Sequence, residues 1–78
     1  MDKLIMQRIG KRIRKGRKAI GITQAQLAEK FGQDRATITN YELGRFGPHI
    51  TELPLLAEIL QVEINFFFDF SDDASLPD

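Results

Sequence analysis

The chain has 78 residues, no cysteine and a formal net charge of zero. A chain of this length forms one small domain, and the missing thiols exclude a disulfide framework and a thiolate zinc site. No apolar run approaches the roughly 18 residues of a membrane span, and cationic residues interrupt the N-terminal region where a secretory leader has its apolar core. We therefore expect a cytoplasmic protein without membrane contact.

The zero net charge hides an asymmetry along the chain. Residues 1–50 hold all eleven Lys and Arg and four acids, a net charge of +7, whereas residues 51–78 hold seven acids and no Lys or Arg, a net charge of −7. A local field acts on a partner more than the summed charge does. The first part can therefore attract a polyanion, although a solvated basic helix beside an acidic tail gives the same counts.

The first predicted helix covers residues 3–20. Ile5, Ile9 and Ile13 recur four residues apart, the spacing of an apolar stripe on one face of a helix. Gly16 lies inside this stretch and costs the helix up to about 1 kcal/mol relative to alanine. The other face is cationic, and we expect it to be solvated and to steer the chain toward a polyanion. Its members are Lys11, Arg12, Arg14, Lys15 and Lys18.

Two shorter helices follow, separated by three residues. The second is predicted over Gln24–Phe31, with Thr23 opening a capping box. The third is predicted over Arg35–Leu43, where Asp34 can cap the first turn. Residues 37–39 of this helix favour a strand by their side chains, but a lone strand among helices has no partner. The whole chain is therefore predicted to be all-α.

Two more helices are predicted toward the C-terminus. The fourth covers Glu52–Gln61 with Thr51 as its cap, and Pro54 then falls in the first turn, where its missing N–H is not needed. The fifth covers Glu63–Phe70 and holds four of the six phenylalanines. Residues 71–78 are short, polar and acidic, and we expect a flexible tail.

The second and third helices, with a short break that contains a glycine, have the outline of a helix-turn-helix, whose second helix enters the major groove. The chain resembles the Cro/lambda-repressor type of this motif, the XRE family, over roughly residues 8–68. The matching residues are Gly21, Ile22, Thr23, Gln24, Leu27, Ala28, Gly32, Ile38, Tyr41, Glu42, Gly44, Leu60, Gln61 and Val62. The resemblance implies a five-helix, lambda-repressor-like DNA-binding domain over residues 1–70, with a C-terminal dimerisation helix, before the tail over 71–78.

Carried over residue by residue, the resemblance also implies DNA contacts. Base edges would be contacted by Arg35, Ala36, Thr37 and Asn40. The DNA backbone would be contacted by Thr23, Gln24, Thr39 and Arg45, and Gln24 would also brace the recognition helix. Arg17 and Glu42 match a pair that bridges the first and third helices.

Physical chemistry supports the base contacts without the resemblance. Arg35 can donate two hydrogen bonds to guanine O6 and N7, and Asn40 can pair with adenine in the same bidentate way. A cation in the first turn of a helix is mildly unfavourable, so the presence of Arg35 there favours a functional contact. The alternative for each residue is an exposed helix surface without a DNA contact.

The Phe-rich end predicts a second interface. A helix that is apolar nearly all round is usually covered, so Phe66, Phe67 and Phe70 are predicted to form a homodimer interface. One position departs from the family, because Gly16 stands where a large aliphatic residue is usual. Ile20 or a phenylalanine would have to fill that space.

The predicted function is transcriptional regulation, more often repression, by a homodimer that binds a palindromic double-stranded DNA operator. The alternative is an antitoxin or another interaction module that binds a partner protein through its Phe-rich end. No cofactor is predicted for either function. His49 is the only histidine, so no metal site is predicted, and no arrangement of nucleophile and base predicts an enzyme.

Overall fold

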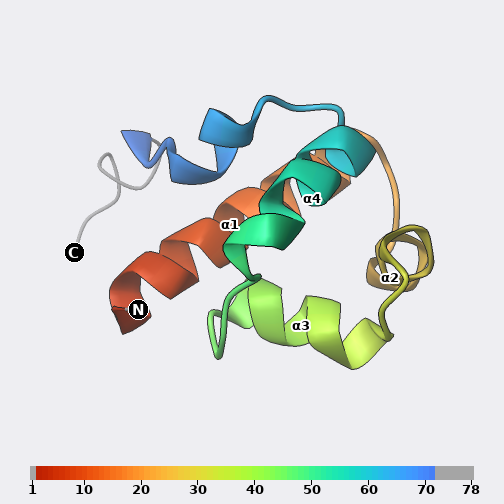
Figure 1. The fold of residues 1–78 in the computed structure, drawn as a ribbon, viewed down its shortest axis with the longest axis horizontal. Coiled ribbons are helices and arrows are strands. Elements are labelled where there is room, and N and C mark those ends of the chain that lie inside the picture. Colours follow the sequence, from red (N-terminus) through yellow and green to blue (C-terminus); the bar gives the residue numbers. More distant parts are fainter. Residues whose placement is uncertain (1, 72–78) are drawn as a thin grey trace.

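The computed structural model describes residues 2–71, which form an all-α structure (Figure 1). Within that range the elements, in chain order, are α1 (Lys3–Ala19), α2 (Gln24–Phe31), α3 (Arg35–Leu43), η1 (Ile50–Glu52), α4 (Leu53–Leu60) and η2 (Ile64–Phe68), where η denotes a 3-10 helix. The predicted tail over 71–78 lies, apart from Ser71, outside the described residues. That tail, and the domain boundary at residue 70, stay predictions.

The first three helices begin and end within one residue of their predicted bounds. Thr23 Oγ1 accepts a hydrogen bond from the N–H of Gln26 at 3.0 Å, and Gln26 Oε1 accepts from the N–H of Thr23 at 2.8 Å, which confirms the capping box. Gly32 ends α2 with a φ of 74°, a left-handed conformation that glycine adopts without strain. The turn that follows sets α3 at a steep angle to α2 (Figure 1).

The predicted fourth helix is shorter than expected and begins later. Thr51 does not cap it, because the chain from Ile50 to Glu52 forms η1, held by a hydrogen bond of 2.8 Å from the N–H of Glu52 to the carbonyl of His49. Pro54 is then an early residue of α4, where its missing N–H leaves no bond unmade. Gln61, predicted as the last helical residue, takes a left-handed φ of 61° and ends α4.

The prediction of a fifth α-helix is wrong, since η2 is a short 3-10 helix over Ile64–Phe68. The carbonyl of Phe66 accepts a hydrogen bond of 2.8 Å from Arg12 Nε. In an α-helix this carbonyl would instead accept from the N–H four residues later. The same carbonyl also accepts a hydrogen bond of 3.4 Å from the N–H of Asp69, which is in an extended conformation. The 3-10 helix η2 therefore ends beside its contact with Arg12.

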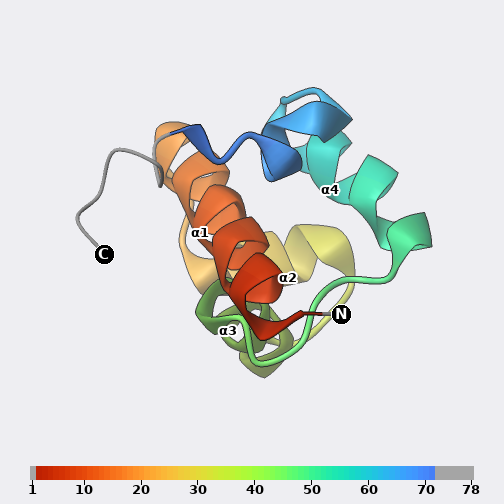
Figure 2. The same ribbon diagram turned by 90° about the vertical axis from the view of Figure 1, so that its left-hand side faces the viewer.

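The core lies where α1, α2, α3, α4 and η2 converge. α1 packs against α3 along one side and against η2 along another, while α4 packs on α2 and η2 (Figures 1 and 2). Ile9 and Ile13 are buried as predicted, but Ile5, at the start of the same stripe, is 42% exposed. The largest fully buried side chains are Phe67, Ile13, Leu27, Ile38, Leu56 and Leu60.

The Phe-rich end is used mainly within the protomer. Phe67 is 0% exposed, so its predicted place at a dimer interface is corrected: a side chain without exposed surface cannot meet a second copy. Phe66 is half-buried against α1, and Phe70 is half-buried with the guanidinium of Arg8 5.7 Å from its ring centroid. Phe68, which the prediction omitted from the interface, is 49% exposed.

α1 and α3 approach one another backbone to backbone. A Cβ atom on Gly10 would overlap the carbonyl oxygen of Tyr41 and would lie 2.7 Å from that of Glu42. A Cβ on Gly44 would lie 2.6 Å from Cγ of Gln7. These distances are shorter than any van der Waals contact allows. Glycine at these two positions therefore lets α3 lie this close to α1.

Within residues 2–71, every helix is too short or too polar to traverse a lipid bilayer.

Candidate nucleic-acid interface

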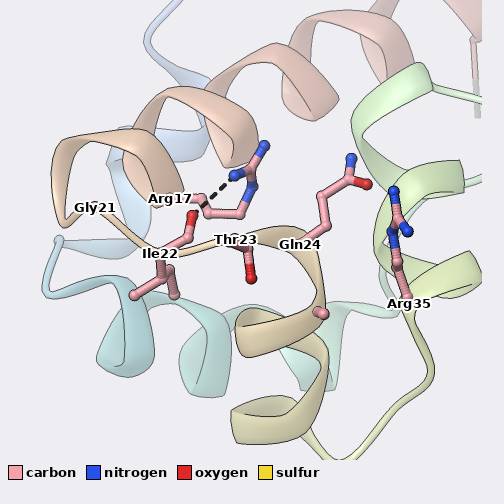
Figure 3. Close-up of a pocket in the computed structure, with 7 residues that line it drawn as sticks. Arg17, Gly21, Ile22, Thr23, Gln24 and Arg35 are labelled. Carbon is pink, nitrogen blue, oxygen red and sulfur yellow. Dashed lines mark hydrogen bonds between the residues drawn. The ribbon is translucent and has the colours of Figure 1, made fainter.

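A buried ion pair joins α1 to α3. Arg17 Nε donates to Glu42 Oε2 at 2.6 Å and Arg17 Nη2 donates to Glu42 Oε1 at 3.0 Å, and both residues are buried. The remaining guanidinium nitrogen of Arg17 donates to the carbonyl of Ile22 at 2.9 Å, drawn in Figure 3. A buried pair is stable only when its geometry is good and its other donors are satisfied. These two residues, paired by the resemblance, meet both conditions.

Gln24 extends this pair to the start of α2. Its Nε2 donates to Glu42 Oε1 at 3.1 Å, and its Oε1 accepts from the hydroxyl of Thr39 at 3.0 Å. Side chains from α1, α2 and α3 are thus linked in one hydrogen-bonded network. Each bond is geometrically specific, so the network fixes how α3 lies relative to the other two helices. The bracing expected of Gln24 is observed.

Two open hollows flank Arg35 on the outer face of this motif. The first, of about 510 Å³, lies between the N-terminal end of α2 and Arg35, and its lining includes Thr23 and Gln24 (Figure 3). The second, of about 390 Å³, is lined by Arg35, Ala36, Thr39, Asn40 and Arg45. The predicted base-contacting residues Arg35, Ala36 and Asn40 therefore share one surface with the predicted backbone contacts.

The two threonines of α3 have already used their hydroxyl protons. Thr37 Oγ1 donates to Asp34 Oδ1 at 2.8 Å, and Thr39 Oγ1 donates to Gln24. A hydroxyl has a single proton, so Thr39 can donate to a phosphate only by leaving Gln24. Thr37 retains its methyl group and its acceptor lone pairs for a base. Hydrogen bonds from the N–H and hydroxyl of Thr37 also lower the pKa of the Asp34 carboxyl.

Arg35 differs from these threonines because its donors are unused. It is exposed in the first turn of α3, and no group within residues 2–71 forms a hydrogen bond or ion pair with it. A guanidinium offers five N–H donors in a planar fork. Asn40 is half-buried one turn later, and its Oδ1 accepts from Arg45 Nη1 at 3.1 Å. The polar groups free to donate on this face therefore belong to Arg35, Asn40 and Arg45.

Not all of the cationic face of α1 is solvated. Lys11, Arg14, Lys15 and Lys18 are exposed as expected, but Arg12 is only 7% exposed. Its guanidinium carbon lies 3.9 Å from the ring centroid of Phe66, a cation–π contact, and its Nη2 lies 3.9 Å from Asp69. The sequence held a signal for this, since Arg12 lies three residues after Ile9, on the apolar stripe itself.

The described part of the chain contains no group of three or more His, Cys, Asp or Glu side chains placed to hold a metal ion.

The chain is similar in sequence to known helix-turn-helix proteins. A family model described as helix-turn-helix matches residues 13–67, more than half of the chain. An uncharacterized HTH-type transcriptional regulator of Archaeoglobus fulgidus is 36% identical over 62 residues, which cover 80% of this chain and 89% of the relative.

Two solved structures have a similar fold. The restriction-modification controller protein C.AhdI from Aeromonas hydrophila has a TM-score of 0.78 and 29% identity, covering 85% of this chain and 96% of that protein. The P22 c2 repressor, solved in complex with a synthetic operator, has a TM-score of 0.70 and 30% identity, covering 76% of this chain and 89% of that protein. The chain therefore belongs to the helix-turn-helix family of the Cro/lambda-repressor (XRE) type, whose members are DNA-binding transcription regulators and not enzymes.

Proposed function

We propose that this protein regulates transcription by binding a specific double-stranded DNA sequence through the outer face of α3. The observation that carries the proposal is the exposed, unpaired guanidinium of Arg35 in the first turn of a helix that a buried network holds in place. An unpaired cation near a helix N-terminus is unfavourable in the free protein. Two hydrogen bonds to guanine O6 and N7 would give it a function.

The small side chains around Arg35 support the same role. Ala36 lies beside it in the second hollow, where a methyl group can contact the C5-methyl of thymine. The first hollow is formed in part by the N-terminal turn of α2, whose backbone N–H groups and dipole favour a phosphate. Thr23 and Gln24 stand at this turn, which supports a backbone contact there. Phosphate contacts would position the protein, and the α3 face would read the sequence.

We propose that the active species is a homodimer on a palindromic operator. Two copies related by a twofold axis would place their recognition helices in successive major grooves, about 34 Å apart. Phe68 and Ile50, which are 49% and 81% exposed, line an apolar hollow of about 170 Å³ together with Ile9, Pro48 and Leu53. This surface, and not Phe67, is the one we propose for self-association, and the places of Phe66 and Phe70 in an interface stay predictions.

Two similar structures support repression as the mode of regulation. The P22 c2 protein is a repressor that binds an operator, and C.AhdI is a controller protein of a restriction-modification system. By analogy, we propose that this chain represses a promoter by occupying it. Because its proposed partner is operator DNA, we place the protein in the cytoplasm.

Selection of bound duplexes from a random double-stranded library, at low salt, tests the proposal. We expect the selected sequences to contain an inverted repeat whose half-sites are one helical turn apart. The logarithm of the binding constant should fall linearly with the logarithm of the salt concentration, with a slope of about −0.9 per phosphate neutralised. A folded protein that binds no duplex at low salt would contradict the proposal.

A further inference from the structure

Arg45 is joined to Asn40 twice, once by backbone and once by side chain. The N–H of Arg45 donates to the carbonyl oxygen of Asn40 at 3.0 Å, as in a Schellman turn closed by Gly44. Arg45 Nη1 also donates to Asn40 Oδ1 at 3.1 Å. The backbone bond fixes where the arginine side chain starts, so the side-chain bond forms within a defined turn and not from a loose loop.

This bond determines which way the Asn40 amide faces. A guanidinium has donors and no acceptor, so the atom of Asn40 that meets Arg45 must be the carbonyl Oδ1 and not the nitrogen. The amide cannot rotate by half a turn without placing its N–H₂ against another donor. Within residues 2–71 no group accepts a hydrogen bond from Asn40 Nδ2, and Asn40 lines the hollow that also contains Arg35.

We infer that Arg45 is a positioning residue for base recognition: it fixes Asn40 as a hydrogen-bond donor, so that Asn40 selects a keto base in the major groove. Guanine presents its O6 and thymine its O4, both acceptors, whereas adenine and cytosine present amino groups at the corresponding place. A fixed N–H₂ donor directed at this place matches a keto oxygen and opposes an amino group, whereas the N7 acceptor is common to both purines and gives no such preference. This inference replaces the sequence-based expectation that Asn40 pairs with adenine, and it adds a second role for Arg45 to the expected contact with the DNA backbone.

The inference rests on the proposed DNA-binding function and deepens it. If Arg45 acted only through its charge on the phosphates, it would strengthen binding to every sequence about equally, since phosphate contacts carry no sequence information. An Arg45 that orients Asn40 instead affects one base position. The two roles therefore predict different results. A charge effect weakens binding to every sequence, whereas an orienting effect changes the base preference at one position.

The test is selection from a random duplex library, at one salt concentration, with matched variants. The wild type should favour G or T over A or C at one position per half-site by about fivefold, the ratio that corresponds to the lower end of base discrimination, about 1 kcal/mol. Asn40→Ala should lose this preference at that position alone. Arg45→Met, which keeps the aliphatic stem and removes the donors, should reduce it to below about twofold at the same position.

Further variants separate orientation from charge and from folding. Arg45→Lys retains a donor and should restore most of the preference. The double variant Asn40→Ala/Arg45→Met should lose no more preference than either single one. Lys30→Met removes an exposed cation from α2, outside both hollows, and should leave the preference unchanged. Thermal unfolding of every variant shows that each is folded.

Two results would overturn the inference while leaving the proposed function intact. One is an Arg45→Met protein that binds all sequences more weakly but keeps the keto preference. The other is an Asn40-dependent position at which the wild type selects A or C. A wild-type protein that enriches no sequence at all would instead overturn the proposed function, and the inference with it.

Discussion

The aromatic ring of Phe66 fills the space that Gly16 leaves open on α1. A Cβ atom on Gly16 would lie 3.3 Å from Phe66 Cε1 and 3.4 Å from Cδ1 of Leu60. The volume that an aliphatic side chain supplies at this position in the family thus comes from the C-terminal segment. Gly16 and η2 therefore depend on each other, and the stacking of Phe66 on Arg12 lies at the same contact.

Two glycines of α1 should differ in how far replacement by alanine changes the free energy of unfolding. Gly10→Ala places a Cβ into the backbone of α3, and we expect a loss of about 3 kcal/mol or more in the free energy of unfolding, at the upper end of overpacking costs. Gly16→Ala meets only the ends of two side chains, and the gain in helix propensity of up to about 1 kcal/mol should offset the contact. Chemical denaturation of both variants measures the difference. Equal losses would contradict the backbone contact.

Loss of one member of the buried Arg17–Glu42 pair should be costly. Arg17→Met leaves the Glu42 carboxylate buried with only Gln24 as a side-chain partner, and we expect a loss of about 3–5 kcal/mol in unfolding free energy. The double variant Arg17→Met/Glu42→Met buries no charge and should recover much of that stability. A double-mutant cycle by urea unfolding checks this. If the double variant is as unstable as the sum of the singles, the pair is not energetically coupled.

Alkaline pH should destabilise the fold through Tyr41. Burial, and then the hydrogen bond that its hydroxyl donates to Glu52 at 3.1 Å, raise the pKa of Tyr41 to about 12. Because this pKa is above the unfolded value of about 10, its stabilising contribution is complete below pH 10. It should be lost between about pH 10 and 12, by up to about 2 kcal/mol. Unfolding midpoints across this range measure the fall.

Tyr41→Phe is the matched control for this pH dependence. The variant lacks the titrating hydroxyl, so its stability should fall less steeply above pH 10 than that of the wild type. The variant also loses the bond to Glu52, which lowers stability at neutral pH by about 1 kcal/mol. Parallel curves for the two proteins would show that other groups cause the alkaline loss.

Arg35 should determine sequence preference more than affinity for DNA in general. Arg35→Ala removes the proposed contact to guanine, so binding to the selected operator should weaken by about 1–3 kcal/mol and one base position should become degenerate. Binding to unrelated duplexes should change little, apart from one lost charge. Fluorescence anisotropy with operator and scrambled duplexes, at matched salt, measures both. An unchanged preference would remove Arg35 from the base-reading residues.

Two neighbouring phenylalanines should give different results when replaced by glutamate. Phe68→Glu changes an exposed side chain and should yield a folded monomer, because a charge would be placed in the proposed self-association surface. Phe67→Glu buries a carboxylate in the core and should unfold the protein. Light scattering gives the mass and circular dichroism the helix content. A dimeric, folded Phe68→Glu protein would place the interface elsewhere.

Local signals predicted the helix-turn-helix well. Thr23, Gln26, Gly32 and Asp34 act through bonds within a few residues of one another, so the bounds of α2 and α3 follow from the sequence. The beta-forming residues 37–39 did not obscure this, because the caps on both sides agree on a helix.

The C-terminal elements could not be predicted from local signals because distant residues determine them. Glu52 accepts a hydrogen bond from the hydroxyl of Tyr41, 11 positions earlier, besides the local bond from the N–H of His49, and this favours η1 over an earlier start of α4. Arg12 binds the carbonyl of Phe66, 54 positions away along the chain, and ends η2. The pattern of apolar residues over 63–70 carries no information about a partner so far away in the chain.

The candidate site, too, was predictable from the sequence only in part. The residue types of Arg35, Ala36 and Asn40, together with the family resemblance, were enough to assign them to the exposed face of α3. Which donors are still free required the structure, since the hydroxyl protons of Thr37 and Thr39 are engaged by Asp34 and Gln24. The same is true of the orientation that Arg45 gives to Asn40.

The bare backbone contact at Gly10 also limits how this protein can acquire a new target sequence. With no side chain between α1 and the carbonyls of Tyr41 and Glu42, α3 cannot be tilted by small changes of residue size at this crossing, because any added atom clashes outright. A new sequence preference in this chain would then come from exchange of side chains on the outer face of α3. The outer positions are free to vary while the inner ones hold the helix at one depth.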